Sequence, residues 1–443
     1  MLLTGCDRAQ IVDPGAIAIK DGMILAAGDE AGILHDYAAT ETIDAGGAVV
    51  HAGFIDAHLH STQHSARSVL PLMEGTAITM GHWKAELRPE DEKSSAALAA
   101  LELLRCGYTG FVDPGTAFEP DAVAEVALEI GIRAWVTDPY IADRASFLAE
   151  RIPAFFSPSF LTRWPKNHAD ALSRLGKQLF RNRAPETLVR GYIGLYGEGS
   201  DSLALHATAL EMARNNAVQF QKHLGYSPDV YRDLSRELGK PVVEALGDRD
   251  LIDDRVTLIH MNLLSDSEIG LLAERAARLV WCPGGQLAMI GKGGARGRMA
   301  TAHRAGIQVG IASDIPRGFN FDGLGTLAFL TGKASGDPVE ARDVFLMRTL
   351  GAAASIGAEA ELGSLEAGKT ADFVIRRPQS AEALGFDPYL EQAVAAGRDT
   401  IDRVYVAGRC VLKDGMPTRA DAPEIVARAH QSARAIATRI DLV

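Results

Sequence analysis

Gly53-Phe54-Ile55-Asp56-Ala57-His58-Leu59-His60 is an apolar run that leads directly into two histidines. Along a β-strand, residues i and i+2 lie on the same face, so His58 and His60 are expected to point the same way. Three further strand-like runs end similarly: residues 217–222 lead to His223, 256–259 to His260 and 307–313 to Asp314. In a parallel barrel all strand C-termini meet at one face. The sequence therefore predicts that these polar residues converge on one site.

Eight candidate strands alternate with helical patterns through the middle of the chain. The strands are mostly unbroken apolar runs, as expected for strands buried on both faces. Helical patterns such as 94–105 and 265–277 lie between them, which predicts a parallel sheet closed into a (β/α)8 TIM barrel of the α/β class. The candidate strands span residues 53–58, 110–113, 132–137, 189–195, 217–223, 256–260, 278–282 and 307–313. In the long connection 137–189, the aromatic segment 155–160 is interpreted either as part of a lid or as packing of one inserted helix.

The flanking segments predict a second, smaller domain, because the 443 residues exceed the about 250 that a barrel needs. Residues 16–20 and 23–28 are strand-like and enclose Asp21-Gly22, a strong hairpin signal. After about residue 362 the strand pattern returns. We expect a small β-sandwich domain formed by the N- and C-terminal segments. The expected boundaries are 1–52 for the first half of the sandwich, 53–361 for the barrel, 362–420 for the second half and 421–443 for a C-terminal helix.

Composition excludes several classes of protein. Forty-five Lys and Arg against 57 Asp and Glu give a net charge of −12, which disfavours nucleic acid as a partner. No apolar stretch reaches about 18 residues without a charge, so no membrane span is expected. Leu2-Leu3-Thr4-Gly5-Cys6 superficially resembles a lipoprotein cleavage box but lacks a basic and an apolar region, and we interpret it as the first strand. The four cysteines are scattered without CxxC spacing, which fits a reducing cytoplasm.

Histidines and a carboxylate at a barrel mouth predict a metal site. Neutral imidazoles suit zinc, iron or cobalt, and a carboxylate adds negative charge. A bound metal can lower the pKa of water from 15.7 to about 7, a change that no lone side-chain base matches. Taken singly, His260 could be a hydrogen-bonded core residue and Asp314 a cap of the following segment. Their shared position at strand ends favours a metal-dependent hydrolase.

Three segments resemble the amidohydrolase superfamily. Residues 53–60 resemble its first-strand motif. Gly363-Ser364-Leu365-Glu366-Ala367-Gly368-Lys369-Thr370-Ala371-Asp372-Phe373-Val374 resembles the segment where the chain of that family returns to its β-sandwich domain. Trp281-Cys282-Pro283-Gly284-Gly285-Gln286 resembles the seventh-strand stretch of the branch that holds chlorotriazine hydrolases, cytosine deaminases and guanine-type deaminases. The resemblance covers nearly the whole chain.

The resemblance implies one divalent metal ion, with zinc expected and iron, cobalt or manganese as alternatives. It assigns the metal ligands to His58, His60, His223 and Asp314. His260 matches the sixth-strand histidine that hydrogen-bonds the attacking water or the substrate, and Asp314 would also accept a proton from that water. Binuclear relatives carry a carboxylated lysine on strand 4, whereas residues 189–195 contain no lysine. One metal is therefore favoured over two.

Tyr226 departs from the family pattern. Deaminases of this branch usually have a glutamate three residues after the strand-5 histidine, where it shuttles a proton to the ring nitrogen and the leaving amine. Tyrosine, with a pKa near 10, is a poor proton shuttle at neutral pH. It can still donate a hydrogen bond to a carbonyl or heterocyclic nitrogen of the substrate, and simple packing is the alternative interpretation.

Further residues are expected near the substrate. The predicted substrate contacts, besides Tyr226, are Gln286, His64, Arg67 and His82. Glu198, after strand 4, is a carboxylate near the mouth whose plainer interpretation is a solvated loop residue. The Gly-rich segment 291–297 lacks the Lys-Ser/Thr ending of a P-loop and is interpreted as a surface loop, with contact to a polar or anionic substrate as the alternative.

Together these features predict an enzyme, a hydrolase that cleaves a C–N bond other than a peptide bond. The expected substrate is a small heterocyclic amine, cyclic amidine, amide or urea. Hydrolytic displacement of another leaving group, a halide or thiolate, is an alternative on the same scaffold. A non-catalytic binding protein on a degenerate scaffold is the alternative outside enzymes. The family often forms dimers or larger assemblies, so a homo-oligomer is expected.

Overall fold

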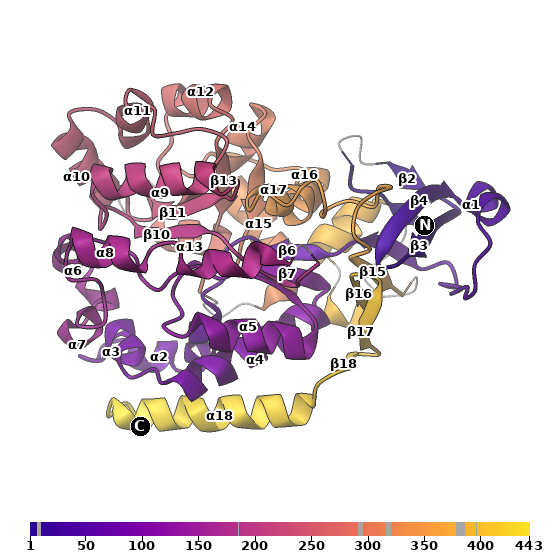
Figure 1. Ribbon diagram of the computed structural model, residues 1–443, viewed down its shortest axis with the longest axis horizontal. Helices are drawn as coiled ribbons and strands as arrows, with labels where there is room; N and C mark the ends of the chain where they lie inside the picture. Colours follow the sequence, from indigo (N-terminus) through magenta and orange to yellow (C-terminus); the bar gives the residue numbers. More distant parts are fainter. Residues whose placement is uncertain (7–9, 185, 291–295, 316–319, 378–385, 396) are drawn as a thin grey trace.

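The computed structural model describes residues 1–6, 10–184, 186–290, 296–315, 320–377, 386–395 and 397–443. Figure 1 shows a large part in which strands and helices alternate, and a smaller β-rich part beside it that contains the N-terminus. The mixed α/β class expected from the sequence is confirmed. Among the described residues, no helix combines the length and apolar character needed to cross a bilayer.

The large part contains two parallel sheets. The four-stranded sheet has the order β6-β7-β8-β9 and the five-stranded sheet the order β10-β11-β12-β13-β14. The first sheet consists of β6 (Phe54–Asp56), β7 (Tyr108–Val112), β8 (Arg133–Val136) and β9 (Val189–Gly191). The second consists of β10 (Ile193–Gly197), β11 (Phe220–Leu224), β12 (Val256–His260), β13 (Arg278–Trp281) and β14 (Val309–Ile311). Strand order follows chain order, as consecutive β-α-β units require.

The two sheets are linked at both edges. Between β9 and β10 only Tyr192 intervenes, and its hydroxyl donates to the carbonyl oxygen of Asp113 at 2.7 Å. At the other edge, the amide of Ala57 donates to Ile311 O at 3.3 Å, and that of Asp314 to His58 O at 2.9 Å. The strand ends that carry the histidines and the aspartate therefore lie next to one another.

Two strand predictions needed adjustment. The single strand expected over 189–195 is interrupted at Tyr192. The strand expected from residue 217 begins at Phe220, because Ala217 adopts a left-handed backbone with φ of 52° and ends the preceding helix turn. The other expected strands differ only at their ends.

Helices cover the strands on the outside of the large part (Figure 1). The helix expected over 94–105 begins earlier, at Pro89, because proline suits the first helical position and Glu90, Asp91 and Glu92 follow in the first turn. The helices that follow strands are α4 (Pro89–Arg105), α5 (Pro120–Ile130), α9 (Leu203–Asn215), α10 (Pro228–Leu238), α11 (Val242–Gly247), α12 (Asp266–Glu274), α13 (Pro283–Met289), α14 (Met299–Arg304), α15 (Leu324–Ala334), α16 (Ala341–Arg348) and α17 (Leu350–Ala354).

Two connections carry extra short helices that matter for the site. After β6 come η1 (Ser61–Ser68), α2 (Leu70–Met73) and α3 (Met80–Ala85). The long connection after β8 holds α6 (Ala145–Arg151), η2 (Pro153–Phe155), α7 (Pro158–Leu161), α8 (His168–Arg174) and η3 (Lys177–Arg183). Further one-turn segments are η4 (Phe321–Gly323), η5 (Leu390–Ala395) and η6 (Arg398–Thr400).

The smaller part combines both ends of the chain. Its seven-stranded mixed sheet has the order β18-β17-β16-β15-β5-β1-β2, and β3 and β4 form a separate hairpin, as Asp21-Gly22 predicted. The elements are β1 (Leu2–Leu3), β2 (Ile11–Val12), β3 (Gly15–Lys20), β4 (Met23–Asp29), α1 (Glu30–Asp36), β5 (Val49–Ala52), β15 (Phe373–Arg376), β16 (Ile401–Val406), β17 (Arg409–Lys413) and β18 (Met416–Pro417). The antiparallel pair β5–β15 joins the two chain segments.

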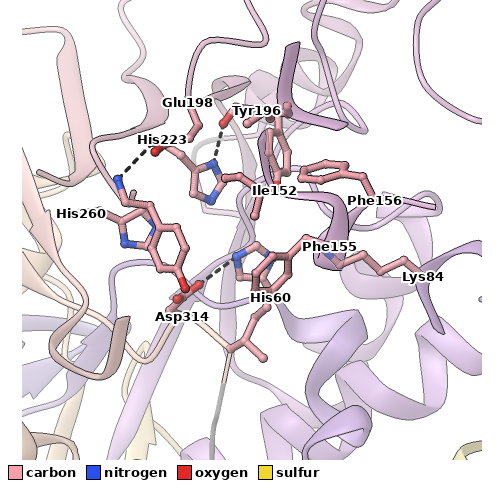
Figure 2. A pocket seen from close by; sticks show the side chains of 13 residues that line it. His60, Lys84, Ile152, Phe155, Phe156, Tyr196, Glu198, His223, His260 and Asp314 are labelled. Atoms are coloured by element: carbon pink, nitrogen blue, oxygen red, sulfur yellow. Dashed lines mark hydrogen bonds and ion pairs between the residues drawn. The ribbon is translucent and has the colours of Figure 1, made fainter. Parts of the chain in front are cut away.

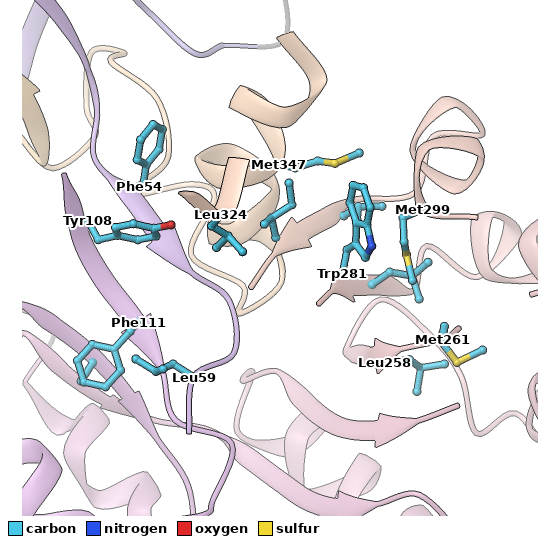
Figure 3. Packing of buried hydrophobic residues seen from close by; sticks show 14 of the residues in the cluster. Phe54, Leu59, Tyr108, Phe111, Leu258, Met261, Trp281, Met299, Leu324 and Met347 are labelled. Atoms are coloured by element: carbon cyan, nitrogen blue, oxygen red, sulfur yellow. The ribbon is translucent and has the colours of Figure 1, made fainter. Parts of the chain in front are cut away.

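The C-terminal helix α18 (Ala422–Arg439) runs back along the large part (Figure 1). It packs against α4, where the hydroxyl of Ser432 donates to Asp91 Oδ1 at 2.6 Å and the Arg439 guanidinium also pairs with the Asp91 carboxylate. The core between strands and helices contains large buried side chains, among them Phe54, Tyr108 and Trp281 (Figure 3). Because close-packed protein interiors deform little, this core holds the strand ends in fixed positions.

Candidate metal centre and active site

Four side chains converge on one point: His58 and His60 from the segment just after β6, His223 from β11, and Asp314 from just after β14. Figure 2 shows His60, His223 and Asp314 facing one another. His58 Nε2 lies 3.2 Å from His60 Nε2 and 3.1 Å from His223 Nε2. Asp314 Oδ1 lies 3.0 Å from His60 Nε2 and 3.8 Å from His58 Nε2. Ligand atoms at about 2.1 Å from one ion in a tetrahedron are about 3.4 Å apart. The observed spacing fits a single metal ion.

His260 completes the cluster. One of its ring nitrogens lies within 4.8 Å of ligand atoms of His58 and His223. Its ring stacks on that of His223, with 5.4 Å between the centroids. The side chain thus stands beside the four converging groups, where it can contact either a metal ion or a molecule bound next to one.

The backbone around the site is held in uncommon conformations. His260 and Asp314 have φ of 80° and 62°, and Glu198, which follows β10, has φ of 52°. Left-handed backbone is uncommon for residues other than glycine and concentrates at functional sites. Here it turns the chain sharply after β12 and β14, where His260 and Asp314 face the cluster, and after β10, where Glu198 faces the amides of Tyr226 and Ser227.

The buried carboxyl group of Asp56 ties the two strands that carry three of the convergent residues. Its Oδ1 accepts hydrogen bonds from the amide of His58 at 3.2 Å and from that of Ser313 at 3.1 Å. Burial raises the pKa of Asp56 to about 7. Asp56 therefore fixes the backbone of the first-strand motif relative to the residue that precedes Asp314.

The electrostatic state of the cluster suits a cation. Burial lowers the pKa of His58 and of His223 well below the ordinary histidine value, so both rings are neutral at pH 7. Burial alone would raise the pKa of Asp314, but the hydrogen bond with His60 and the neighbouring histidines hold it well below its usual range. The Nδ1 atom of His223 lies 2.6 Å from the carbonyl oxygen of Tyr196, which orients Nε2 toward the cluster.

A pocket opens above the cluster. Its floor is polar and one wall is apolar and aromatic (Figure 2). The lining residues are His60, Lys84, Leu148, Ile152, Phe155, Phe156, Tyr196, Glu198, His223, Tyr226, His260, Asp314 and Ile315. A small molecule in this pocket would contact the convergent groups on one side and apolar side chains on the other, as in many small-molecule sites.

Comparison with known sequences identifies the family. The sequence profile described as the amidohydrolase family matches residues 49–411. The chain belongs to the amidohydrolase family. A 5-methylthioadenosine/S-adenosylhomocysteine deaminase from Desulforudis audaxviator is 30% identical over 436 residues, which is 95% of this chain and 94% of that protein. A 5'-deoxyadenosine deaminase from Methanopyrus kandleri is 26% identical over 398 residues, 87% of this chain and 86% of that protein.

Solved structures share the fold of this amidohydrolase. A zinc-bound adenosine deaminase from Xanthomonas campestris superposes with a TM-score of 0.82 at 22% identity, covering 99% of this chain and 97% of its own. An atrazine chlorohydrolase from Arthrobacter aurescens TC1 in complex with zinc gives a TM-score of 0.80 at 23% identity, with 98% of both chains covered. Family membership and the curated relatives confirm the predicted enzyme class, a metal-dependent hydrolase of C–N bonds other than peptide bonds.

Of the predicted substrate contacts in this amidohydrolase, Tyr226 lines the pocket. Its ring lies 5.0 Å from that of His260 and 6.4 Å from that of Phe155. The carboxylate of Glu198 accepts hydrogen bonds from the amides of Tyr226 at 3.1 Å and Ser227 at 2.9 Å. Glu198 is thus a buried pocket residue, unlike the solvated loop residue that its sequence context suggested, and burial raises its pKa to about 7.

Three predicted contacts after β6 point to other partners. His64 is buried, stacks on Phe321, and its Nε2 lies 3.0 Å from Glu102 Oε2. Arg67 forms a two-point ion pair with the same carboxylate. His82 accepts the amide of Thr79 at 3.1 Å and so caps α3. None of the three is among the described residues that line the pocket, because α4 and the start of α3 bind them elsewhere.

Gln286, on α13, is also placed away from the described pocket lining. Its Oε1 accepts a hydrogen bond from the indole nitrogen of Trp281 at 2.6 Å, and its amide nitrogen donates to Gly297 O at 3.4 Å. It therefore braces the segment after β13. Of the Gly-rich segment, residues 291–295 lie outside the described residues.

Sequence reasoning missed several pocket residues. Tyr196 on β10 and Lys84 on α3 lie within otherwise ordinary elements, and nothing in their local pattern marks them. Within the aromatic segment, Phe155 and Phe156 line the pocket, and Phe160 is buried against Trp164 at 5.6 Å between ring centroids.

Proposed function

We propose that this amidohydrolase holds one zinc ion through His58, His60, His223 and Asp314 and uses it to hydrolyse a small heterocyclic substrate. The observation that carries the proposal is the convergence of three Nε2 atoms and one carboxylate oxygen at 3.0–3.8 Å from their neighbours. The donor set suits zinc, and iron, cobalt and manganese are the alternatives that metal analysis distinguishes. The absence of lysine from residues 189–195 supports one metal rather than two.

The fit to a metal rests on the chemistry of the donors. The Nε2 atoms of His58, His60 and His223 lie near van der Waals contact, and the Nδ1 atoms of His58 and His60 have no protein partner among the described residues. A cation at the centre would bind lone pairs that otherwise face one another. When bound, the metal supplies Lewis acidity, which lowers the pKa of water and polarises the group that is attacked.

The side chains around the centre then have separate tasks. The carboxylate of Asp314, ionised at neutral pH, accepts the proton that the attacking water loses. His260 hydrogen-bonds the water or the developing oxyanion from the neighbouring strand. Tyr226 donates a hydrogen bond from its hydroxyl to the substrate, and the aromatic wall formed by Phe155 and Phe156 excludes bulk water.

The substrate class follows from the relatives and the pocket. Curated relatives across nearly the full chain are deaminases of 5-methylthioadenosine and S-adenosylhomocysteine, so release of ammonia from an amino-substituted ring is the reaction we propose first. A second candidate, displacement of a different leaving group, is supported by Tyr226 in the position where a proton-shuttling glutamate was expected and by the structural likeness to an atrazine chlorohydrolase.

Two features of the architecture belong to the same proposal. The parallel sheets linked at both edges support a closed (β/α)8 barrel over residues 53–361. The mixed sheet and hairpin support a small sandwich domain made of 1–52 and 362–420, with 421–443 as the C-terminal helix.

A cytoplasmic location is supported by the four cysteines, which form no disulfide in this structure. A homodimer or larger assembly is supported by exposed apolar side chains on the hairpin, such as Ile19, Met23 and Leu25.

A panel of small C–N substrates tests the function. Zinc-loaded protein is incubated with amino-purines, amino-pyrimidines, amino-triazines and cyclic ureas, and released ammonia, amine or carboxylate is measured. We expect turnover of at least one ring-bearing substrate and its loss in Asp314→Asn. Full zinc occupancy with no turnover across the panel would favour the non-catalytic binding protein instead.

A further inference from the structure

Two buried arginines lie at the end of the parallel sheets where the strands begin. Arg348 is the last residue of α16 and is 3% exposed, and Arg376 is the last residue of β15 and is 2% exposed. Both guanidinium groups lie over the ring of Phe54, the first residue of β6, with Cζ at 3.8 Å from the ring centroid for Arg348 and at 5.7 Å for Arg376. Figure 3 shows this ring beside that of Tyr108, which begins β7. The two positive charges therefore share one buried region at the junction of the large and the small part.

The hydrogen-bond partners of Arg348 are uncharged. Its Nη1 donates to the carbonyl oxygen of Ala393 at 2.8 Å, and its Nη2 donates to the hydroxyl of Tyr108 at 2.9 Å. Burial raises the pKa of Tyr108, so this hydroxyl stays protonated. The Nε atom of Arg348 is buried and has no hydrogen-bond partner among the described residues. Because the C-terminal end of α16 offsets only a fraction of a unit charge, Arg348 keeps both an unused donor and most of its positive charge.

The hydrogen-bond partners of Arg376 are uncharged as well. Its Nε donates to His51 Nε2 at 2.9 Å, and its Nη1 donates to the hydroxyl oxygen of Thr400 at 2.7 Å. Burial lowers the pKa of His51 well below the ordinary histidine value, so the ring is neutral. Burial and the nearby Arg348 lower the pKa of Arg376 to about 9, which is still above neutral pH. The carboxylate of Asp322 acts on Arg376 more weakly than Arg348 does, so its attraction does not offset the repulsion between the two guanidinium groups.

Buried charges of one sign in one region need a counter-ion. Buried ions in proteins are paired, and an ion left without its partner strongly destabilises the folded state. Cys106, which also lies near Arg376, supplies no charge, because burial raises the pKa of its thiol to about 12. No carboxylate among the residues that the structure describes forms an ion pair with either arginine, although the planar guanidinium group is well suited to binding anions.

We propose that this region binds one small monovalent anion, of the size of chloride, which Arg348 and Arg376 hold at the junction of the two parts. The anion neutralises positive charge that the described residues leave buried, and it ties α16 of the large part to β15 of the small part. The site lies opposite the strand ends that carry the candidate metal ligands, at the end of a parallel barrel that usually serves stability. The anion should therefore affect the stability of the protein and leave turnover unchanged.

Unfolding at constant ionic strength tests this proposal. Zinc-loaded protein is unfolded with urea while chloride replaces gluconate, an anion too large for a buried site, over about a hundredfold range of concentration. An anion that binds only the folded protein lowers the unfolding equilibrium constant, at most in proportion to its own concentration. We expect at least about a tenfold decrease in this constant for the wild type, and less than about a twofold decrease for Arg348→Met and for Arg376→Met.

The control variant is Arg278→Met. Arg278 begins β13 and pairs with the carboxylate of Glu359 at 2.7 Å, so its charge already has a protein partner. This variant should keep the chloride dependence of the wild type. An unfolding constant of the wild type that does not change with chloride, or a chloride dependence that persists in both Arg348→Met and Arg376→Met, would overturn the proposal.

Bromide locates the anion directly and covers the case in which an arginine variant fails to fold. Wild-type crystals grown with sodium bromide are measured at the bromine absorption edge. The proposal requires an anomalous peak within hydrogen-bond distance of Arg348 or Arg376, and water alone at this position contradicts it. A bromide peak without chloride-dependent stability would mark an adventitious ion only and would also refute the proposal. Neither measurement uses turnover, so the outcome is independent of the proposed hydrolytic function.

Discussion

The ion pair between Arg133 and Asp372 joins the large and the small part of the chain. Arg133 begins β8, and its Nε and Nη2 donate to Asp372 Oδ2 and Oδ1 at 2.7 and 3.0 Å. The side chains are 8% and 3% exposed, and Asp372 Oδ1 also accepts the amide of Ala407 at 2.8 Å. Asp372 lies in the segment that resembles the return of the family's chain to its β-sandwich. The ion pair explains why a carboxylate stands at this position of the motif.

Removing Asp372 should destabilise the protein strongly. Asp372→Ala leaves a buried guanidinium group without its partner, which costs about 3–5 kcal/mol, and the amide of Ala407 loses its acceptor, which costs about 1–3 kcal/mol more. Arg133→Met should cost about 3–5 kcal/mol for the same reason. Replacing both residues by apolar ones removes the uncompensated charge, so the double variant Arg133→Met/Asp372→Ala should be more stable than the sum of the single losses predicts, by about 2–3 kcal/mol.

Urea unfolding followed by tryptophan fluorescence measures these differences, with zinc content as a control. Because Arg133 stands at the beginning of its strand, opposite the strand ends that carry the candidate metal ligands, zinc content should be unchanged in folded variants. A loss below about 1 kcal/mol in Asp372→Ala, or strict additivity in the double variant, would refute the view that this pair fixes the two parts to each other.

Three further perturbations address pH, catalysis and the backbone of the site. Burial raises the pKa of Glu92 to about 7, so the folded state binds an extra proton between pH 4.5 and 7 and loses about 3 kcal/mol of stability over that range as pH rises. Glu92→Gln should lack this loss, and unfolding free energies of both proteins at pH 4.5 and 7 check it; parallel pH profiles would contradict it. His260→Gln should keep zinc, but its kcat should fall at least about 100-fold, which is the effect of losing one contact to an oxyanion or one general base. If this variant loses zinc instead, His260 is a metal ligand. Gly197→Ala would place a Cβ atom 2.1 Å from His223 O at a φ of +78°, so zinc affinity in a chelator competition should fall at least tenfold; unchanged affinity would show that β11 tolerates the shift.

The convergence of the candidate metal ligands was predictable because each of them follows a local rule. His58, His223, His260 and Asp314 end apolar runs that are typical of buried strands, and parallel strands bring their C-terminal ends together. Glu198 follows the same rule after β10, and the solvated-loop interpretation favoured by its sequence context was wrong, because the residue is buried and lines the pocket. The break at Tyr192 left no trace in the apolar pattern; the hydroxyl of Tyr192 donates to the carbonyl oxygen of Asp113, far away in sequence.

The pocket walls were less predictable, since they are made by tertiary contacts. His64 and Arg67 follow the metal motif closely in sequence, but Glu102 on α4 binds both and turns them away from the pocket. From its sequence context, Lys84 is expected on the surface of a short helix. In the structure the aromatic segment after β8 packs over it. A residue close in sequence to a candidate metal-binding histidine was therefore seldom found in the pocket, whereas a polar residue at the end of a predicted strand usually was.

Metal content is the most direct test of the central claim, that the converging side chains form a one-metal hydrolytic centre. Wild type, His58→Ala and the control His82→Ala, which alters an exposed histidine at a helix start, are loaded with zinc, desalted and analysed by mass spectrometry for metal per chain. The account predicts one zinc per chain in the wild type and in His82→Ala, and loss of both zinc and turnover in His58→Ala. Two ions per wild-type chain, or retained zinc and turnover in His58→Ala, would contradict it.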